Sequence, residues 1–565
     1  MEHPQGNIGK PIEPAGLRVS DWAIVRRFVD VGGRRVHGRI MGSGPPALFI
    51  HSSPANSSYV IADMATVAHS YTCYAFDTPG FGLSDALPAE TLEVADLADA
   101  MAETLAAIGM PPCPVFGCHT GGTIALELAT RHPERVTGVL IDGLAVFTDA
   151  ENADILPWYF QKIPIDPLGG HYASVWTRFR DQSTWFPWFA RDPAMLNERD
   201  LTSPEATNRW VSMYFDAQAT YTPAYLAAMT YRDGPAQVAA LGVPAVFTAI
   251  ESDMLYPHLD RIAPARADQE IRRVGDSVVR RRALTGEAFA RFGSAGSPPE
   301  LAAKVVASDR VLRQFVDTAQ GQLMLRSLGD PARPPLLVVH DVPGAGGTAE
   351  AAMAALAERY FVLAFDLPGC GESSPLEAPT VGDLAATLWR GCDALGHDRI
   401  GLLGIGFGSA IAAEMAASKP NRATSLALEG LLLADGNDRA VLRRSYAPPV
   451  TVEPDGAHWF RTWQMIRDMG IWWPWFTPTR AALRRVPAEY GANALHRRTC
   501  ETLRQPGVWN AVAAAAIDAD SSARLGELRI PVTFVDGSNN PLATAYDDVA
   551  REKFPHAKWR ALGEI

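Results

Sequence analysis

The stretch Val115-Phe116-Gly117-Cys118-His119-Thr120-Gly121-Gly122 decides how this chain folds, because it joins an apolar run to a helical segment through a glycine-rich turn. The apolar residues predict a buried strand, and residues 123–129 have the composition of a helix. In strand–turn–helix motifs of the Gly-x-Ser-x-Gly kind, the central residue projects out of a tight turn. That central residue is His119 here. Since a neutral imidazole titrates near working pH, the stretch predicts acid–base chemistry at this turn.

The same motif returns later in the chain as Gly404-Ile405-Gly406-Phe407-Gly408. Gly406 follows His119 by 287 positions, and the same offset relates Phe28-Val29-Asp30 to Phe315-Val316-Asp317. A period this long indicates a duplicated domain, because the repeats of solenoid proteins are far shorter. Gly406 has no side chain, so we expect any chemistry to belong to the first half.

Length and composition agree with two globular domains. The chain has 565 residues, of which 47% are hydrophobic and 20% charged, and this length exceeds what one hydrophobic core organises. Short β-rich runs alternate with helical segments, which predicts an α/β fold with a mostly parallel, doubly wound sheet in each half. The expected segments are an N-terminal extension (1–20), a first domain (21–292, with a cap at about 150–235), a linker (293–312) and a second domain (313–565, with a cap at about 437–520).

Charge and cysteine usage exclude several classes of partner. The net charge of −12 argues against nucleic acid or an anionic membrane surface, and no apolar run has the length of a membrane span. The six cysteines show no metal-ligand spacing, which predicts reduced thiols in a cytoplasmic protein with no metal or organic cofactor. The arginines between positions 272 and 282 are interpreted as solvated or interface surface. The expected partner is a small-molecule substrate.

A longer loop motif occurs once in each half and carries a resemblance to a known family. The pattern D-x-P-G-x-G-x-S is found at Asp77–Ser84 and at Asp366–Ser373. With the strand–turn–helix motif, it resembles the α/β-hydrolase superfamily over nearly the whole chain, most closely the branch of haloalkane dehalogenases and epoxide hydrolases. The resemblance implies two tandem α/β-hydrolase-fold domains, each with a helical cap. It also implies that both halves lack the usual nucleophile, because His119 and Gly406 occupy its position.

The resemblance assigns an oxyanion-binding loop to the end of the first half's first predicted strand. The loop begins His51-Ser52-Ser53-Pro54. In the family, backbone N–H groups of this loop and of the residue after the nucleophile hold an oxyanion, which implies Ser52 or Ser53 together with Thr120. The ring of His51 could take part in the site, but bracing the loop is the favoured role.

Two acids are candidates to orient His119, as the acid of a catalytic triad orients its imidazole. Asp142 ends the strand that follows the turn, where some haloalkane dehalogenases carry their catalytic acid, and Asp253 follows a later strand that ends near Thr248. A helix-capping or loop role is the alternative for both. The histidine that the family places after its last strand has no counterpart in either half, so an ordinary Ser-His-Asp mechanism is excluded.

The cap segment supplies the remaining candidates. His171, Trp176 and Arg180 lie at near-helical spacing and are expected to share a face. Aromatic walls with one histidine and one arginine suit a small apolar or aromatic substrate that carries a carbonyl or an anion. The second half repeats these residue types in the same register, so packing and a structural ion pair are the alternative explanation.

The sequence therefore predicts an enzyme, a hydrolase or lyase in which His119 is a general acid or base aided by Asp142 and His171. The second half would be a catalytically silent partner in an intramolecular pseudo-dimer, with further homo-oligomers possible. The alternative is a pseudoenzyme that binds a small hydrophobic ligand in the capped pocket.

Overall fold

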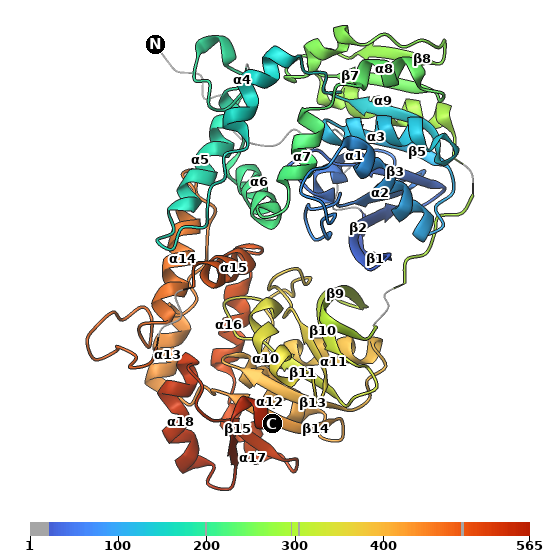
Figure 1. The fold of residues 1–565 in the computed structure, drawn as a ribbon. Helices are drawn as coiled ribbons and strands as arrows, with labels where there is room; N and C mark the ends of the chain where they lie inside the picture. The colour runs from blue at the N-terminus through green and yellow to red at the C-terminus, as the bar shows by residue number, and fades with distance from the viewer. Residues whose placement is uncertain (1–21, 198–199, 295, 303–305, 488–490) are drawn as a thin grey trace, which may run out of the picture. The chain divides into compact units, whose positions relative to one another are not determined.

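The computed structural model describes residues 22–197, 200–294, 296–302, 306–487 and 491–565 (Figure 1). The expected N-terminal extension, residues 1–20, lies outside this part of the chain. The described residues form two eight-stranded, mostly parallel sheets with helices around each, which confirms the expected α/β class with one such sheet in each half.

The first sheet has the strand order β1-β2-β4-β3-β5-β6-β7-β8. Its strands are β1 (Val25–Val31), β2 (Arg34–Gly42), β3 (Pro46–Ile50), β4 (Thr72–Phe76), β5 (Cys113–Cys118), β6 (Val136–Asp142), β7 (Ala245–Ala249) and β8 (Gln269–Arg273). Strand β2 pairs antiparallel with β1 and β4, whereas the pairs from β4 to β8 are parallel. Every residue of β3, β4 and β5 is buried, as expected of parallel strands covered on both faces.

The helices of the first half either cover a face of its sheet or belong to the expected cap segment. They are α1 (Ile61–Ala65), α2 (Val94–Ala107), α3 (Thr120–Arg131), α4 (Asp149–Tyr159), α5 (Gly170–Thr184), α6 (Pro204–Ala217), α7 (Thr222–Met229), α8 (Gly234–Ala240) and α9 (Val278–Phe292), with 3-10 turns η2 (Ser57–Val60), η3 (Pro133–Arg135), η4 (Pro193–Met195) and η5 (Tyr256–Arg261). The crossovers through α1 and α2 run in opposite directions across the sheet, so right-handed connections place these helices on opposite faces. Residues of α1 and α9, including Met64, Leu284 and Phe289, pack with Phe49 and Phe116 of the sheet in one apolar core.

The second sheet repeats the first strand for strand, in the order β9-β10-β12-β11-β13-β14-β15-β16. Its strands are β9 (Ser308–Thr318), β10 (Gly321–Gly329), β11 (Pro335–Val339), β12 (Phe361–Phe365), β13 (Ile400–Ile405), β14 (Ala423–Glu429), β15 (Val532–Val535) and β16 (Lys558–Arg560). Its helices are α10 (Glu350–Leu356), α11 (Val381–Ala394), α12 (Gly408–Ser418), α13 (Gly436–Ser445), α14 (Ala457–Met469), α15 (Ala492–Leu503), α16 (Trp509–Asp518), α17 (Ser521–Gly526) and α18 (Pro541–Lys553), with 3-10 turns η6 (Gly346–Ala349) and η7 (Leu562–Glu564). Strand β9 already begins at Ser308, so the last part of the expected linker 293–312 belongs to the second sheet.

The two compact units of the molecule do not coincide with the two halves of the sequence. The first unit comprises Met1–Lys162, Phe179–Leu201 and Met213–Ala302, and the second comprises Ile163–Arg178, Thr202–Ser212 and Ala303–Ile565. The beginnings of α5 and α6, which the sequence assigned to the first cap, therefore pack with the second half. Within the described residues, no helix is both long and apolar enough to cross a lipid bilayer.

Candidate active site

His119 occupies the turn between β5 and α3, at the carboxyl end of the first sheet. Its backbone has φ 50° and ψ −116°, a conformation that residues with a side chain seldom adopt. Glycines allow the close approach around it, since a Cβ at Gly121 would overlap the carbonyl oxygen of Ile50. This turn projects the imidazole outward, and the side chain is 30% exposed.

The partner of the His119 ring is Asp253. Nε2 of His119 lies 2.8 Å from Oδ2 of Asp253, whose other oxygen accepts the backbone N–H of Leu255 at 2.8 Å. Asp253 follows β7 and its side chain is 19% exposed, so the pair borders solvent. A carboxylate at Nε2 stabilises the tautomer that carries its proton there, which leaves the lone pair on Nδ1.

Asp142 has a different environment from the one expected. Its backbone oxygen accepts the His119 N–H at 2.9 Å, but Oδ2 of its carboxylate pairs with Nε of Arg281 at 3.1 Å. Burial raises the pKa of Asp142 to about 6, although the Arg281 guanidinium opposes the rise. Of the two acids that the sequence left open, Asp253 therefore binds Nε2, and the half-buried Asp142 carboxylate pairs with Arg281 instead.

Arg281 is a site residue that the sequence did not single out. It belongs to α9, its side chain is buried, and it bridges Asp142 to Asp63 of α1 through ion pairs with both. The expected surface role of the arginine run is therefore wrong at this position. The sequence could have indicated that Arg281 is buried, because this residue precedes Leu284 and Ala288 on the apolar stripe of α9 at helical spacing.

His51 braces the loop after β3. Its Nδ1 donates to the carbonyl oxygen of Ser52 at 2.8 Å, and its Nε2 accepts the backbone N–H of Thr78 at 2.9 Å. Both ring nitrogens are thus used by the backbone, and burial lowers the pKa of the ring. This arrangement holds the ring neutral and fixes it against the backbone of the loop.

The loop and the start of α3 carry the expected oxyanion donors. Ser52, Ser53 and Thr120 are all buried. The amide N–H groups of Ser53 and Thr120 donate to no other group among the described residues, and the buried Oγ of Ser53 has no partner there either. Both amides are therefore left without a partner in this part of the chain, and their role as oxyanion donors stays a prediction.

The three cap candidates are divided between the two compact units. His171 is buried, accepts the Asp166 N–H at its Nδ1 (3.1 Å) and lies with Nε2 3.0 Å from Nδ1 of His496. Trp176 donates from Nε1 to the Pro454 carbonyl at 3.2 Å, so both residues pack within the second compact unit. Arg180 is exposed, because helix geometry turns it away from the buried stripe. A role for these three residues in the site stays a prediction.

The second half has a cavity at the equivalent turn but different chemistry. The cavity has a volume of about 470 Å³ and is lined, among others, by Asp341, Glu429, Arg498 and Asn540. Asn540, which stands where the first half has Asp253, caps α18 by accepting the Leu542 N–H at 2.9 Å. The second half thus has neither the imidazole nor the orienting acid of the first.

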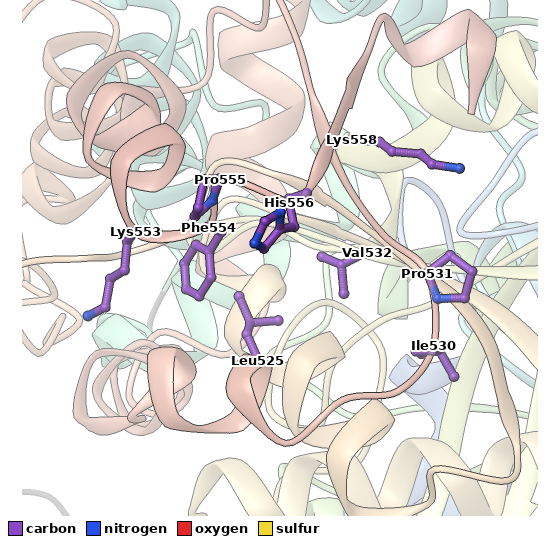
Figure 2. Close-up of a pocket in the computed structure, with 10 residues that line it drawn as sticks. Leu525, Ile530, Pro531, Val532, Lys553, Phe554, Pro555, His556 and Lys558 are labelled. Atoms are coloured by element: carbon purple, nitrogen blue, oxygen red, sulfur yellow. The ribbon is translucent and has the colours of Figure 1, made fainter.

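A smaller cavity of about 390 Å³ lies in the second half at the other end of the strands, away from the turn (Figure 2). Its walls include Leu525, Ile530 and Phe554, with Lys553 and Lys558 also lining it. Ile530 precedes β15 and Lys558 begins β16, so this cavity lies at the amino ends of the strands. Ligands of open α/β sheets bind at the carboxyl ends, so the cavity is not part of the site at the turn.

The sheet order, the strand–turn–helix and the loop after β3 together define an α/β-hydrolase fold. The chain belongs to the alpha/beta hydrolase fold family, which matches residues 45–263 and 334–466.

Individual relatives match short parts of the chain. A stretch of 137 residues is 31% identical to 2-(acetamidomethylene)succinate hydrolase of Mesorhizobium japonicum and covers 24% of this chain and 49% of that protein. A stretch of 115 residues is 28% identical to haloalkane dehalogenase 2 of Mycobacterium bovis, over 20% of this chain and 40% of that protein. The chain thus matches less than half the length of these relatives. Among solved structures, an epoxide hydrolase of Vigna radiata aligns with 48% of this chain and 96% of its own at 16% identity and a TM-score of 0.35.

Proposed function

We propose that the first half is a hydrolase or lyase in which His119 acts as general acid and base, without a covalent acyl-enzyme. The observation that carries this proposal is the 2.8 Å hydrogen bond between Nε2 of His119 and Asp253. It pairs a proton-transfer group with an orienting carboxylate at the position where this family places its nucleophile. The expected substrate is a small apolar or aromatic molecule with a carbonyl or an anionic group.

The chemistry follows from the donors that surround the turn. A substrate carbonyl oxygen would accept hydrogen bonds from the amides of Ser53 and Thr120, which polarises the carbonyl carbon. Nδ1 of His119 would take a proton from water as the water oxygen attacks that carbon. Asp253 would stabilise the resulting imidazolium. The proton would then pass to the leaving group as its bond to carbon breaks, which restores the neutral ring. In a lyase, Nδ1 would instead remove a proton from the substrate itself.

The role of the second half is part of the same proposal. Gly406 and Asn540 stand where the first half has His119 and Asp253, so the second half would be a silent partner in an intramolecular pseudo-dimer. The inclusion of Ile163–Arg178 in the second compact unit supports such a pairing of the halves. We also propose that the chain belongs to the branch of the superfamily that contains haloalkane dehalogenases and epoxide hydrolases.

Turnover of a panel of small esters, diketones, epoxides and haloalkanes tests the assignment. We expect His119→Ala to lower turnover by roughly 10²–10⁴-fold, the usual contribution of a positioned acid or base. His69→Ala, at an exposed histidine, is the matched control and should leave turnover unchanged. Reaction in ¹⁸O-labelled water separates the two reaction types, because only a hydrolase places the label in the product.

Three results would contradict the proposal. Stoichiometric labelling of a serine by a fluorophosphonate probe would show a covalent mechanism. Unchanged turnover in His119→Ala would show that the reaction takes place at another site. If compounds bound to the wild type and to His119→Ala equally and neither protein converted any, the first half would be a ligand-binding pseudoenzyme.

A further inference from the structure

The turn of the second half holds a carboxylate of its own chain. Oδ1 of Asp341 accepts the backbone N–H of Val342 at 2.8 Å and that of Phe407 at 2.9 Å. Phe407 follows Gly406, and Val342 lies in the loop after β11, so these are the counterparts of the Thr120 and Ser53 amides. A negatively charged oxygen therefore accepts from the same pair of donors that would hold a substrate oxyanion in the first half.

Gly406 has the conformation that makes room for this carboxylate. Its φ of 56° is close to the 50° of His119, so both turns have the same backbone shape. A Cβ at Gly406 would lie 2.8 Å from Oδ2 of Asp341 and closer still to Oδ1 and Cγ. Carbon and oxygen atoms do not approach so closely without a bond, so a side chain at residue 406 and a carboxylate in this position exclude each other.

The remaining contacts of Asp341 complete an anion site. Its side chain is 10% exposed, and its Oδ2 lies 3.3 Å from Nη2 of Arg498 on α15. Arg498 is itself held by a hydrogen bond from Nε to the carbonyl oxygen of Pro343 at 2.8 Å. Two amide donors and one guanidinium around a single carboxylate are a common way for proteins to bind a small carboxylic acid.

We propose that the second half retains a working anion-binding site at its turn, that Asp341 is its built-in ligand, and that a small free carboxylate binds there once this side chain is removed. The first half differs at two linked positions, with Ser52 in place of Asp341 and His119 in place of Gly406. The short serine side chain leaves its two amides to a substrate, and the turn can then carry an imidazole. The two halves thus represent an open and a self-filled version of one site.

A double-mutant cycle between Gly406 and Asp341 tests the steric part of the proposal. Gly406→Ala should lower Tm by several degrees more in the wild type than in the Asp341→Ser variant. The backbone cost of alanine at positive φ is present in both backgrounds and cancels, so the difference reports only the contact between Cβ and carboxylate. Equal losses of Tm in the two backgrounds would overturn the proposal.

Acetate tests the binding part. The Asp341→Ser variant should gain a saturable rise of Tm with sodium acetate beyond the response of the wild type, because a ligand of the folded state stabilises it. Sodium chloride at the same ionic strength and acetamide, which is uncharged, should not produce this gain. The first half is identical in both proteins, so any acetate bound there cancels. The same acetate response in variant and wild type would refute the site.

A second variant keeps the test decisive if Asp341→Ser does not fold. Asp341→Asn retains an oxygen that can accept the Val342 and Phe407 N–H groups. In this background Gly406→Ala should lower Tm by as much as in the wild type, since the side-chain amide at residue 341 fills the same space as the carboxylate. A markedly smaller loss would show that the side chain of residue 341 does not occupy the position described.

Discussion

His458 should make the stability of the second unit depend on pH in a direction that its hydrogen bonds determine. Its Nδ1 accepts the backbone N–H of Glu453 at 3.2 Å, so the ring proton is on Nε2, which lies 2.9 Å from Oδ1 of Asn208. Both ring nitrogens are therefore engaged with the ring neutral, and the residue is 2% exposed. Burial lowers the pKa of His458 from 6.5 to about 4. A second proton would break the contact with Glu453 and place a charge in the core.

The magnitude follows from this difference in pKa. Between pH 6.5 and about 4 the unfolded chain binds a proton at His458 that the folded protein does not. The contribution of His458 to the free energy of unfolding is therefore complete above pH 6.5 and is lost as the pH falls toward 4. At about 1.4 kcal/mol per pKa unit, the whole effect is about 3 kcal/mol, and about 2 kcal/mol of it is lost by pH 5.

Urea unfolding of wild type and His458→Gln between pH 7.5 and 5 measures this effect. The free energy of unfolding of the variant, for the transition that the substitution alters, should fall by about 2 kcal/mol less over this range. Carboxyl groups with raised pKa, such as Glu501, act in the opposite direction but are common to both proteins. His69→Gln, at an exposed histidine, is the control and should match the wild type. Parallel pH curves for wild type and His458→Gln would refute the reasoning.

Three further predictions concern the first site. Gly143→Ala places a Cβ 2.6 Å from Cδ2 of His119 at a residue with φ 69°, so we expect lower turnover and a destabilisation of about 1–2 kcal/mol from the backbone alone, measured by thermal unfolding. Arg281→Met leaves Asp142 buried without its cation and should cost about 3–5 kcal/mol in urea unfolding, and a cost below 1 kcal/mol would mean that the ion pair is dispensable. Asp253→Asn keeps the shape but permits the wrong tautomer of His119, so kcat should fall by up to about 10⁴-fold, whereas an unchanged kcat would remove Asp253 from the mechanism.

The fold could be predicted because its signals are local and occur twice. Each turn needs glycines at fixed offsets, and each parallel strand is buried on both faces, so sequence alone indicated both sheets. The orienting acid could not be decided in the same way. Asp142 ends β6 and Asp253 lies in the loop after β7, both at the carboxyl ends of the strands, and only the direction of the His119 ring selects between them.

The cap residues show where a sequence pattern carries too little information. His171 and Trp176 form a buried stripe on α5, but spacing along a helix does not say which surface that stripe meets. Tertiary packing assigned it to the second unit. Asp341 was missed for a related reason, because a carboxylate after His340 acquires its meaning only when the fold brings it against Gly406, far away in the sequence.

The division of α5 and α6 between the two units affects how the chain is made. The segment Ile163–Arg178 leaves the ribosome well before α14 and α15, which it packs against through His171 and Trp176. At about 5–20 residues per second, the 287 residues from His171 to His458 take roughly 15–60 s to synthesise. During this interval the apolar side chains at the beginning of α5 lack the residues that they contact in the folded protein. The second compact unit therefore depends on a segment made before its own sheet, so the two domains do not complete their packing strictly one after the other.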